Sequence, residues 1–301
     1  MWRASILTIV GSVSRVTKAH STVLAVLGRG VVDASAPIVR ADDAGVTRGD
    51  GCFEGCRLLD GVIDKLDAHL ARMARSAASL DIAFDADAWR GLLAEAVSAW
   101  TNDDEAMDGE AGVRLVLTRG AAGAAASGYV MIAPLPAEYP RQRRDGLTVI
   151  TLPRGFASDA FTASPWLLGG VKTLSYAVNM AAQREAARRA VDEVVFVSSD
   201  GFVLEAPTGS VVWALGRTLH TTPPGATGIL GGTTQQRLFE RAADAGWQTS
   251  DTLARVDELV AADVIWVMSS LRGPVDIVEL DGTRRTRLPD VDAEIRCLAG
   301  F

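Results

Sequence analysis

The sequence predicts an α+β protein built from two domains. Its 301 residues are enough for two domains, and with 48% hydrophobic and 22% charged residues the chain should fold around well-formed cores. Strand-like and helix-like segments follow one another irregularly in both halves, not as a regular strand–helix–strand series. A polar segment over residues 137–146 contains proline and ends in glycine. We therefore place a boundary there, between a small domain over 22–140 and a larger domain over 141–301.

The small domain is expected to combine strands with two helices. Alternating apolar residues around Gly-Arg-Gly predict a hairpin over 22–45. The segment 51–82 predicts a strand, an Asp-Gly turn, a second strand and a helix whose apolar residues recur at helical spacing. A second amphipathic helix is expected over 86–100. Two further strands, 111–120 and 127–136, should flank a loop of small residues, Gly-Ala-Ala-Gly-Ala-Ala-Ala-Ser-Gly.

The larger domain is also expected to be mixed. Its first strand should be followed by a long loop that contains Lys172, and its last strands should form a hairpin around an Asp-Gly turn. The predicted elements are strand 147–153, helix 174–190, three strand-like runs within 192–216, a Pro/Gly loop leading into a helix within 222–247, helix 252–262, strand 263–270 and the terminal hairpin.

Composition narrows the function classes. The net charge of −7 argues against nucleic acid and anionic membranes as partners. Cys52, Cys56 and Cys297 are odd in number and form neither a disulfide framework nor a zinc pattern, so we expect no metal and a cytoplasmic location. Residues 1–21 contain an apolar run too short to span a bilayer. We expect an irregular arm or an over-long start there, in preference to a signal peptide.

Lys172 is the first candidate for chemistry. Only three of the 30 basic residues are lysines, namely Lys18, Lys65 and Lys172. Arginine is not deprotonated in proteins, whereas a lysine in an apolar setting can become a neutral amine and act as a nucleophile or base. Small apolar residues precede Lys172. The alternatives are a Schiff-base lysine and a partly exposed lysine between a strand and a helix.

Glu205 is the second candidate. It follows an apolar run and precedes Ala-Pro, so it should be buried. A buried carboxylate is costly unless it is paired. Glu205 is therefore either the partner of a cationic ring nitrogen or an edge-strand residue that faces water.

The glycine-rich segment over residues 228–234 leads directly into a helix. Backbone N–H groups at such a helix start can bind an anion. The alternative is simple capping, with Thr233 as the N-cap and Gln236 three residues later as a capping box. No Gly-Lys-Ser/Thr follows, so a nucleotide P-loop is excluded.

His69 and Arg72 lie three residues apart on one face of the first predicted helix. This face is either exposed to water or presents Arg72 as a phosphate-binding group. Together the four motifs describe one ligand with an aldehyde, a basic ring nitrogen and a phosphate. Pyridoxal 5′-phosphate has all three groups.

The order of these motifs resembles the class IV aminotransferases, the fold type IV pyridoxal-phosphate enzymes, from about residue 22 to residue 280. The resemblance implies a small N-terminal α/β domain, a larger C-terminal domain with a β-barrel-like core, and a homodimer whose sites lie at the subunit interface. It also implies that Arg72 binds the phosphate, that Lys172 is the catalytic Schiff-base lysine and that Glu205 pairs with the pyridine nitrogen.

Further cofactor contacts are implied by the same resemblance. Leu230 matches the residue that packs on the ring, and Thr233 and Thr234 match the phosphate-binding amides. Ser270 matches a further phosphate ligand, and Tyr176 the residue that bonds the ring hydroxyl.

The substrate side resembles the family less closely. The strand that contains Phe53 matches the family's glycine–aromatic–Glu strand, and Phe53, Arg119 and Trp166 are our candidates for substrate contacts. Ser210 stands where the family often has Asn. The loop over 120–128 lacks the Arg and His of the D-amino-acid enzymes.

The function that the resemblance implies is that of a 4-amino-4-deoxychorismate lyase, which releases pyruvate and makes p-aminobenzoate for folate. The segment from 169 to 205 is most similar to proteins assigned this role. The alternative is an aminotransferase for D-amino acids or branched-chain amino acids. A non-catalytic binding protein is the alternative from another class, and the presence of both Lys172 and Glu205 argues against it.

Overall fold

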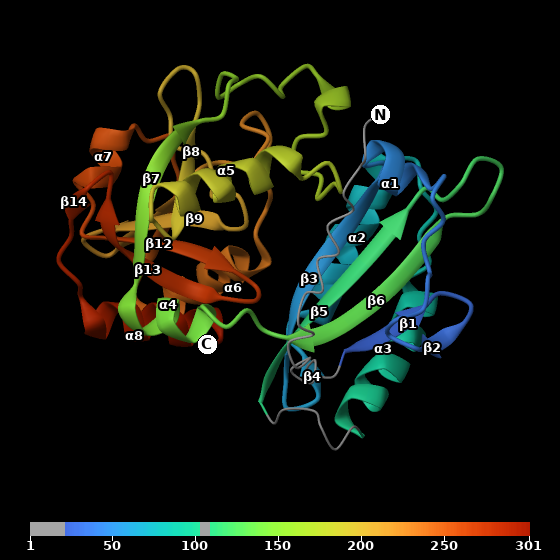
Figure 1. Cartoon of the computed structure of the whole chain (residues 1–301). Helices are drawn as coiled ribbons and strands as arrows, with labels where there is room; N and C mark the ends of the chain where they lie inside the picture. Colours follow the sequence, from blue (N-terminus) through green and yellow to red (C-terminus); the bar gives the residue numbers. More distant parts are fainter. Residues whose placement is uncertain (1–21, 103–108) are drawn as a thin grey trace, which may run out of the picture.

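Two curved β-sheets, one in each half of the chain, organise the structure (Figure 1). The computed structural model describes residues 22–102 and 109–301. The arm expected over 1–21 lies outside the described residues. Helix α4 (Tyr139–Asp145) lies between the last strand of the first sheet and the first strand of the second. The α+β prediction is confirmed, and our proposed domain boundary falls within α4.

The first sheet is antiparallel, with strand order β2-β1-β6-β5-β3-β4. Its three longest strands pair along most of their length, so that Glu54 lies opposite Leu115 and Leu115 lies opposite Val130. Successive side chains on a strand point to opposite faces. The six strands are β1 (Val23–Val26), β2 (Gly30–Val32), β3 (Gly51–Leu59), β4 (Val62–Ile63), β5 (Glu110–Thr118) and β6 (Ser127–Pro134).

Within residues 22–102 and 109–301, helices cover only one face of this sheet. Helices α2 (Leu66–Ser79) and α3 (Ala86–Thr101) pack on the face that carries Cys52 and Cys56, whose side chains are fully buried. A short helix, α1 (Ala44–Arg48), precedes β3. The opposite face of the sheet is turned toward the second half of the chain (Figure 1).

The second sheet mixes parallel and antiparallel pairs, in the order β11-β10-β9-β12-β13-β7-β8, with β14 paired to β13. Apolar side chains are buried on both of its faces, which is why its central strands are continuous apolar runs. The strands are β7 (Leu147–Pro153), β8 (Glu193–Val197), β9 (Ser210–Leu215), β10 (Thr218–Thr221), β11 (Gln248–Asp251), β12 (Val264–Ser269), β13 (Gly273–Leu280) and β14 (Thr283–Arg284).

Helices pack around this second sheet. Helices α6 and α8 share one apolar core with Trp266, whereas α7 packs into the core that contains Trp213. Helix α5 packs against β7 and β8. The helices are α5 (Ala177–Arg188), α6 (Thr233–Ala242), α7 (Val256–Val260) and α8 (Pro289–Ala299), with short 3₁₀ turns η1 (Pro165–Leu167) and η2 (Ala243–Ala245).

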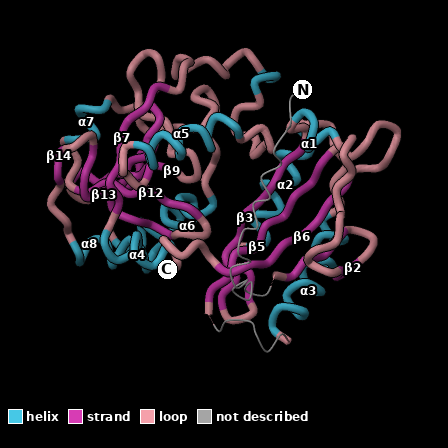
Figure 2. The backbone as a smooth tube through the Cα atoms, viewed as in Figure 1, coloured by secondary structure: helices cyan, strands magenta, loops and turns pink. Residues whose placement is uncertain are grey.

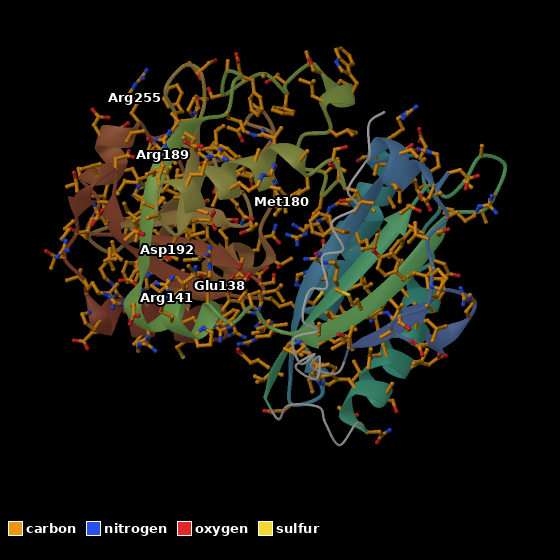
Figure 3. The ribbon with its side chains drawn as sticks, viewed as in Figure 1. Glu138, Arg141, Met180, Arg189, Asp192 and Arg255 are labelled. Carbon is orange, nitrogen blue, oxygen red and sulfur yellow. The ribbon has the colours of Figure 1, made fainter. Side chains whose placement is uncertain are left out.

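The connection from β7 to α5 is long and has little regular structure (Figure 2). It carries η1 and then Lys172 toward the first sheet. At the other end of the second sheet, α4 is held in place by an ion pair between Arg141 and Asp192, which lie side by side in Figure 3.

Several elements differ from the sequence-based expectation, among them the following three. The helix predicted over 252–262 contains only α7, which begins after Arg255, where the Arg255 N–H donates to the Glu258 carboxylate at 2.7 Å. The run 201–205 makes single bridges instead of a strand. Helix α8 was not predicted; proline begins it and Ile295 and Ala299 anchor it in the core. None of the helices within 22–102 and 109–301 combines the length and apolar character that crossing a membrane requires.

The loop between β5 and β6 offers a test of backbone strain. Gly120 and Gly123 both have positive φ, +81° and +74°. A Cβ on Gly120 would lie 2.4 Å from the Ala125 carbonyl oxygen, whereas one on Gly123 would meet nothing within 4 Å. We predict that Gly123→Ala lowers the free energy of unfolding by about 1–2 kcal/mol through the left-handed backbone alone. Gly120→Ala should cost at least about 1 kcal/mol more because of the added contact.

Chemical denaturation of the two variants beside the wild type measures both values. Equal losses in the two variants would show that the loop moves aside for the methyl group, contrary to this prediction.

Candidate functional site

A cavity of about 1060 Å³ lies between the two halves of the chain. The uncovered face of the first sheet forms one wall, through residues of β3, β5 and β6. Loops of the second half form the rest. The cavity contains Arg72, Lys172 and Glu205, the three residues for which the sequence indicated charge chemistry.

Lys172 is placed by backbone pairing with the other half of the molecule. The Phe53 N–H donates to the Lys172 carbonyl at 3.0 Å, and Cys52 and Thr173 form an isolated bridge. The Lys172 N–H in turn donates to the Ser76 hydroxyl at 3.2 Å. Lys172 therefore lies in an extended segment before α5 that is fixed against both β3 and α2.

The Lys172 amine is in a setting that favours its neutral form. Its Nζ lies 4.5 Å from the centre of the Phe53 ring and 5.8 Å from that of Tyr176. Burial, and after it the positive charge of Arg72, lower the pKa of Lys172 to about 8. The fraction of neutral amine near neutral pH is therefore far larger than for an ordinary lysine.

Glu205 lies in the same cavity, and its backbone pairs with the strand β8. The Phe196 N–H donates to the Glu205 carbonyl at 2.9 Å, and the Leu230 N–H donates to Oε2 at 3.0 Å. Burial raises the pKa of Glu205 to about 7, although the Leu230 N–H and the charge of Lys172 oppose the rise. A cation placed against this carboxylate would restore its charge.

The start of α6 has N–H groups that no side chain caps. The alternative of a capping box at Thr233 is wrong, because Gly232 is the N-cap and Thr233 is the first helical residue. In the described part of the chain, the N–H groups of Thr233, Thr234 and Gln235 have no protein acceptor. The Thr233 hydroxyl instead contacts the Ser270 hydroxyl at 2.9 Å.

Arg72 faces this helix start from α2. Its Nε and Nη2 donate to the two carboxylate oxygens of Glu54, each at 2.7 Å, and its Nη1 donates to the Gly231 carbonyl at 2.8 Å. These bonds use three of the five guanidinium N–H groups and leave two for an anion. Arg72 and His69 are both buried, so the water-exposed alternative for this helix face is wrong.

Glu54 was not among the sequence-based candidates. It is fully buried, and His69 Nδ1 lies 2.8 Å from its Oε2. Burial alone would raise the pKa of Glu54, but Arg72 and His69 together outweigh this and lower it to about 2. The signal in the sequence was its position on β3 between Cys52 and Cys56, which puts a carboxylate on an otherwise apolar face.

The remaining cofactor candidates also border the cavity. Tyr176, at the start of α5, donates its hydroxyl to the Pro207 carbonyl, and Asn179 donates to the same oxygen at 2.8 Å. Burial raises the pKa of Tyr176, so its hydroxyl stays protonated. Leu230, Thr234 and Ser270 line the cavity near the α6 start.

Of the three substrate candidates, the structure brings only Phe53 into the cavity. Arg119 lies outside it and is held by Asp50 at 2.5 Å and by the Leu80 carbonyl at 2.6 Å. Trp166 lies in η1 with 74% of its surface exposed and does not line the cavity.

Arg114 lies on the cavity wall and was missed. It stands on β5 between Gly55 of β3 and Met131 of β6, on the face that also carries Phe53. Within 22–102 and 109–301 no side chain forms an ion pair or hydrogen bond with it, and its charge contributes to the low pKa of Lys172. The alternation of side chains along β5 places Arg114 on the same face as Phe53 only once the register between β3 and β5 is known, and the sequence does not give that register.

These residues fit pyridoxal 5′-phosphate. The free N–H groups of α6 and Arg72 can bind a phosphate, Lys172 offers an amine of lowered pKa to an aldehyde, and Glu205 offers a carboxylate to a basic ring nitrogen. All of them border one cavity.

Comparison with known proteins also indicates a pyridoxal-phosphate enzyme. The family model described as amino-transferase class IV matches residues 51–280. The chain is 41% identical over 269 residues to a bifunctional aminodeoxychorismate lyase / D-amino acid transaminase of Mycobacterium tuberculosis, covering 86% of this chain and 92% of that protein. It is 29% identical over 238 residues to an aminodeoxychorismate lyase of Bacillus subtilis, covering 76% and 77%.

Comparison with solved structures indicates the same family. A hypothetical aminotransferase from Mycobacterium tuberculosis in its PLP-bound form superposes with a TM-score of 0.88 at 40% identity, covering 93% of this chain and 98% of that one. The fold IV transaminase CpuTA1 from Curtobacterium pusillum gives a TM-score of 0.86 at 37% identity, covering 92% and 97%. The predicted family, fold type and cofactor are confirmed. The chain belongs to the class IV aminotransferase family and is a pyridoxal-phosphate-dependent enzyme that acts on small amino or keto acids.

Proposed function

We propose that this enzyme is a 4-amino-4-deoxychorismate lyase, which eliminates pyruvate from its substrate and leaves p-aminobenzoate. The observation that carries the proposal is the wall of the cavity beside Lys172. Arg114 lies there beside Gly55 and Gly112, and no side chain within 22–102 and 109–301 pairs with it, so the wall offers a cation for a carboxylate. The substrate is a ring that carries carboxylates.

Amino transfer from D-amino acids is the second candidate. It is favoured by the name of the Mycobacterium tuberculosis relative, which combines the lyase and D-amino acid transaminase activities. A branched-chain substrate has weaker support, since the putative branched-chain aminotransferase of Methanocaldococcus jannaschii is 28% identical.

The roles of the residues follow from their positions. Arg72, the N–H groups of Thr233 and Thr234, and Ser270 would hold the phosphate. Leu230 would pack on the ring, and Tyr176 would face its hydroxyl group. Glu205 would accept a hydrogen bond from the ring nitrogen and keep it protonated.

The bound cofactor supplies an electron sink for the carbanion that forms at the substrate carbon bearing the amino group. Lys172 removes the proton from that carbon, because it is a base of lowered pKa in the cavity. For amino transfer, Lys172 would also act as the acid that returns a proton on the cofactor side of the cavity. For the lyase reaction, the bond between the ring carbon and the enolpyruvyl oxygen would break instead, and the released enolpyruvate would take up a proton to become pyruvate.

We also propose that the enzyme works as a homodimer. Apolar side chains of η1 and α5 are exposed: Trp166 by 74%, Leu167 by 48%, Val178 by 53% and Met180 by 42%. Leu167 and Met180 also line the cavity, and Met180 lies at the end of α5 that faces the first sheet (Figure 3). A second copy would cover this apolar surface and help to close the cavity.

A cytoplasmic location is likewise our proposal. It rests on Cys52, Cys56 and Cys297, which are free thiols, as a reducing compartment would keep them.

The pKa of Lys172 gives a pH prediction. The rate at which apoprotein attaches pyridoxal phosphate covalently should rise about tenfold per pH unit below pH 8, because the neutral amine is the nucleophile. Above the pKa of about 8 the rate should level off. Borohydride reduction followed by mass spectrometry measures the attached fraction, with Lys172→Ala as the control that attaches none. A rate that still climbs between about pH 9 and pH 10 would indicate an ordinary lysine.

Activity assays test the function. Wild-type enzyme should release p-aminobenzoate and pyruvate in equal amounts from aminodeoxychorismate. If the second candidate also holds, D-alanine and 2-oxoglutarate should yield pyruvate and D-glutamate, whereas L-leucine should give no amino transfer. Chromatography with fluorescence detection follows p-aminobenzoate. Absence of p-aminobenzoate, with turnover of an amino acid, would replace the lyase assignment by a transaminase.

Arg114→Gln provides the matched variant in the same assays. A charge-assisted bond to a carboxylate is worth about 1.5–3 kcal/mol, so kcat/KM should fall by about ten- to hundredfold. Arg119→Gln is the comparison, since Arg119 lies outside the cavity. An unchanged kcat/KM in Arg114→Gln would exclude Arg114 from substrate binding.

Light scattering at micromolar concentration tests the dimer. The expected mass is twice the 31.7 kDa of one chain. Trp166→Glu should shift the mass toward the monomer and lower activity, because a charge would be placed in an apolar contact. A fully active wild-type monomer would refute the proposed dimer.

A further inference from the structure

Lys65 is the second of the two lysines within the described residues, and the chemistry above gives it no task. It directly precedes α2, with a left-handed backbone at φ 53° and ψ 33°. This conformation is unfavourable for any residue with a Cβ, and glycine or asparagine would tolerate it better. A lysine held in such a position points to a role for its side chain.

The side chain of Lys65 is buried behind the start of α6. Only 5% of it is exposed. Its Nζ lies 3.1 Å from the Thr234 hydroxyl oxygen and 3.3 Å from Asp64 Oδ2. Thr234 lines the cavity, whereas Lys65 does not, so Lys65 reaches the cavity only through Thr234.

The direction of the bond to Thr234 follows from chemistry. An ammonium group donates hydrogen bonds and cannot accept one. The Thr234 oxygen must therefore accept from Lys65, and its own hydroxyl hydrogen is free to point elsewhere. Because Thr234 is in the first turn of α6 and borders the cavity, that hydrogen can be donated to a group bound there.

The charges around Lys65 are positive in sum. Asp64 is shared by Lys65 and Arg237, the latter at 2.7 Å, and lies 3.9 Å from Arg57. Arg57 also pairs with Glu110 at 3.1 Å. Glu110 is also shared with Arg143, so two carboxylates face four cations. On the other side of the α6 start, Glu54 offsets the charge of Arg72.

We propose that Lys65 is a positioning residue for the cofactor phosphate. It orients the Thr234 hydroxyl as a donor and places an uncompensated positive charge behind the first turn of α6. The inference rests on the proposed assignment of this helix start to the phosphate.

The test compares two ligands on apoprotein. Pyridoxal 5′-phosphate and pyridoxal share the ring and the aldehyde, but pyridoxal lacks the phosphate. Lys65→Met should weaken the binding of pyridoxal phosphate about tenfold or more, since a charge-assisted contact is lost. Binding of pyridoxal, followed by the same absorbance titration, should change by less than about twofold.

A double-mutant cycle tests the route through Thr234. Thr234→Val removes the hydroxyl at nearly constant shape. In that background, Lys65→Met should weaken pyridoxal phosphate binding by less than about threefold, because the hydroxyl contact is already gone and only the longer-range effect of the charge remains. If Lys65→Met does not fold, Lys65→Gln keeps an N–H donor without the charge, and the same comparison of the two ligands applies.

Three outcomes would overturn the proposal: unchanged binding of pyridoxal phosphate, an equal loss for both ligands, which indicates a purely structural role, or full additivity in the cycle. If wild-type apoprotein binds neither ligand, it is the assignment of the cofactor site, and not the role of Lys65, that fails.

Discussion

The buried carboxylate of Glu54 is the constraint on which the rest of the site depends. A fully buried charge is tolerated only when it is paired, and Glu54 is paired with Arg72 through two bonds of 2.7 Å and contacts His69. This fixes α2 against β3. Because Arg72 also donates to the Gly231 carbonyl, the same cluster joins the first sheet to the loop before α6 in the other half of the molecule.

The resulting cavity has one region that favours an anion and another that favours a cation, as its cofactor requires. One region has free N–H groups, Arg72 and, behind them, Lys65, and therefore favours an anion. Another has Glu205, whose burial raises its pKa to about 7 and makes it a good partner for a cation. Lys172 borders the same cavity, with a pKa lowered to about 8 by burial. No single residue creates this pattern, since each pKa is set by the neighbours that folding supplies.

The cavity wall proposed to contact the substrate is formed by the first sheet. The uncovered face of the first sheet presents Phe53 and Arg114 to the cavity. Arg119, which the sequence also offered, is only five positions away on the chain but is held by Asp50 and the Leu80 carbonyl. Position relative to the sheet, not residue type, separates an arginine that can meet a substrate from one that supports the structure.

The sequence by itself determined the fold class, the cofactor and the choice of Lys172 as a candidate for chemistry. Periodicity, composition and the order of motifs can be read along the chain without knowledge of the tertiary structure. The sequence did not reveal Glu54, Lys65 or Arg114. The first two act through contacts with residues distant in the chain, Arg72 and Thr234, and Arg114 depends on strand register. Only the tertiary structure decided these, since burial and pairing between the two sheets convert ordinary charged residues into parts of one site.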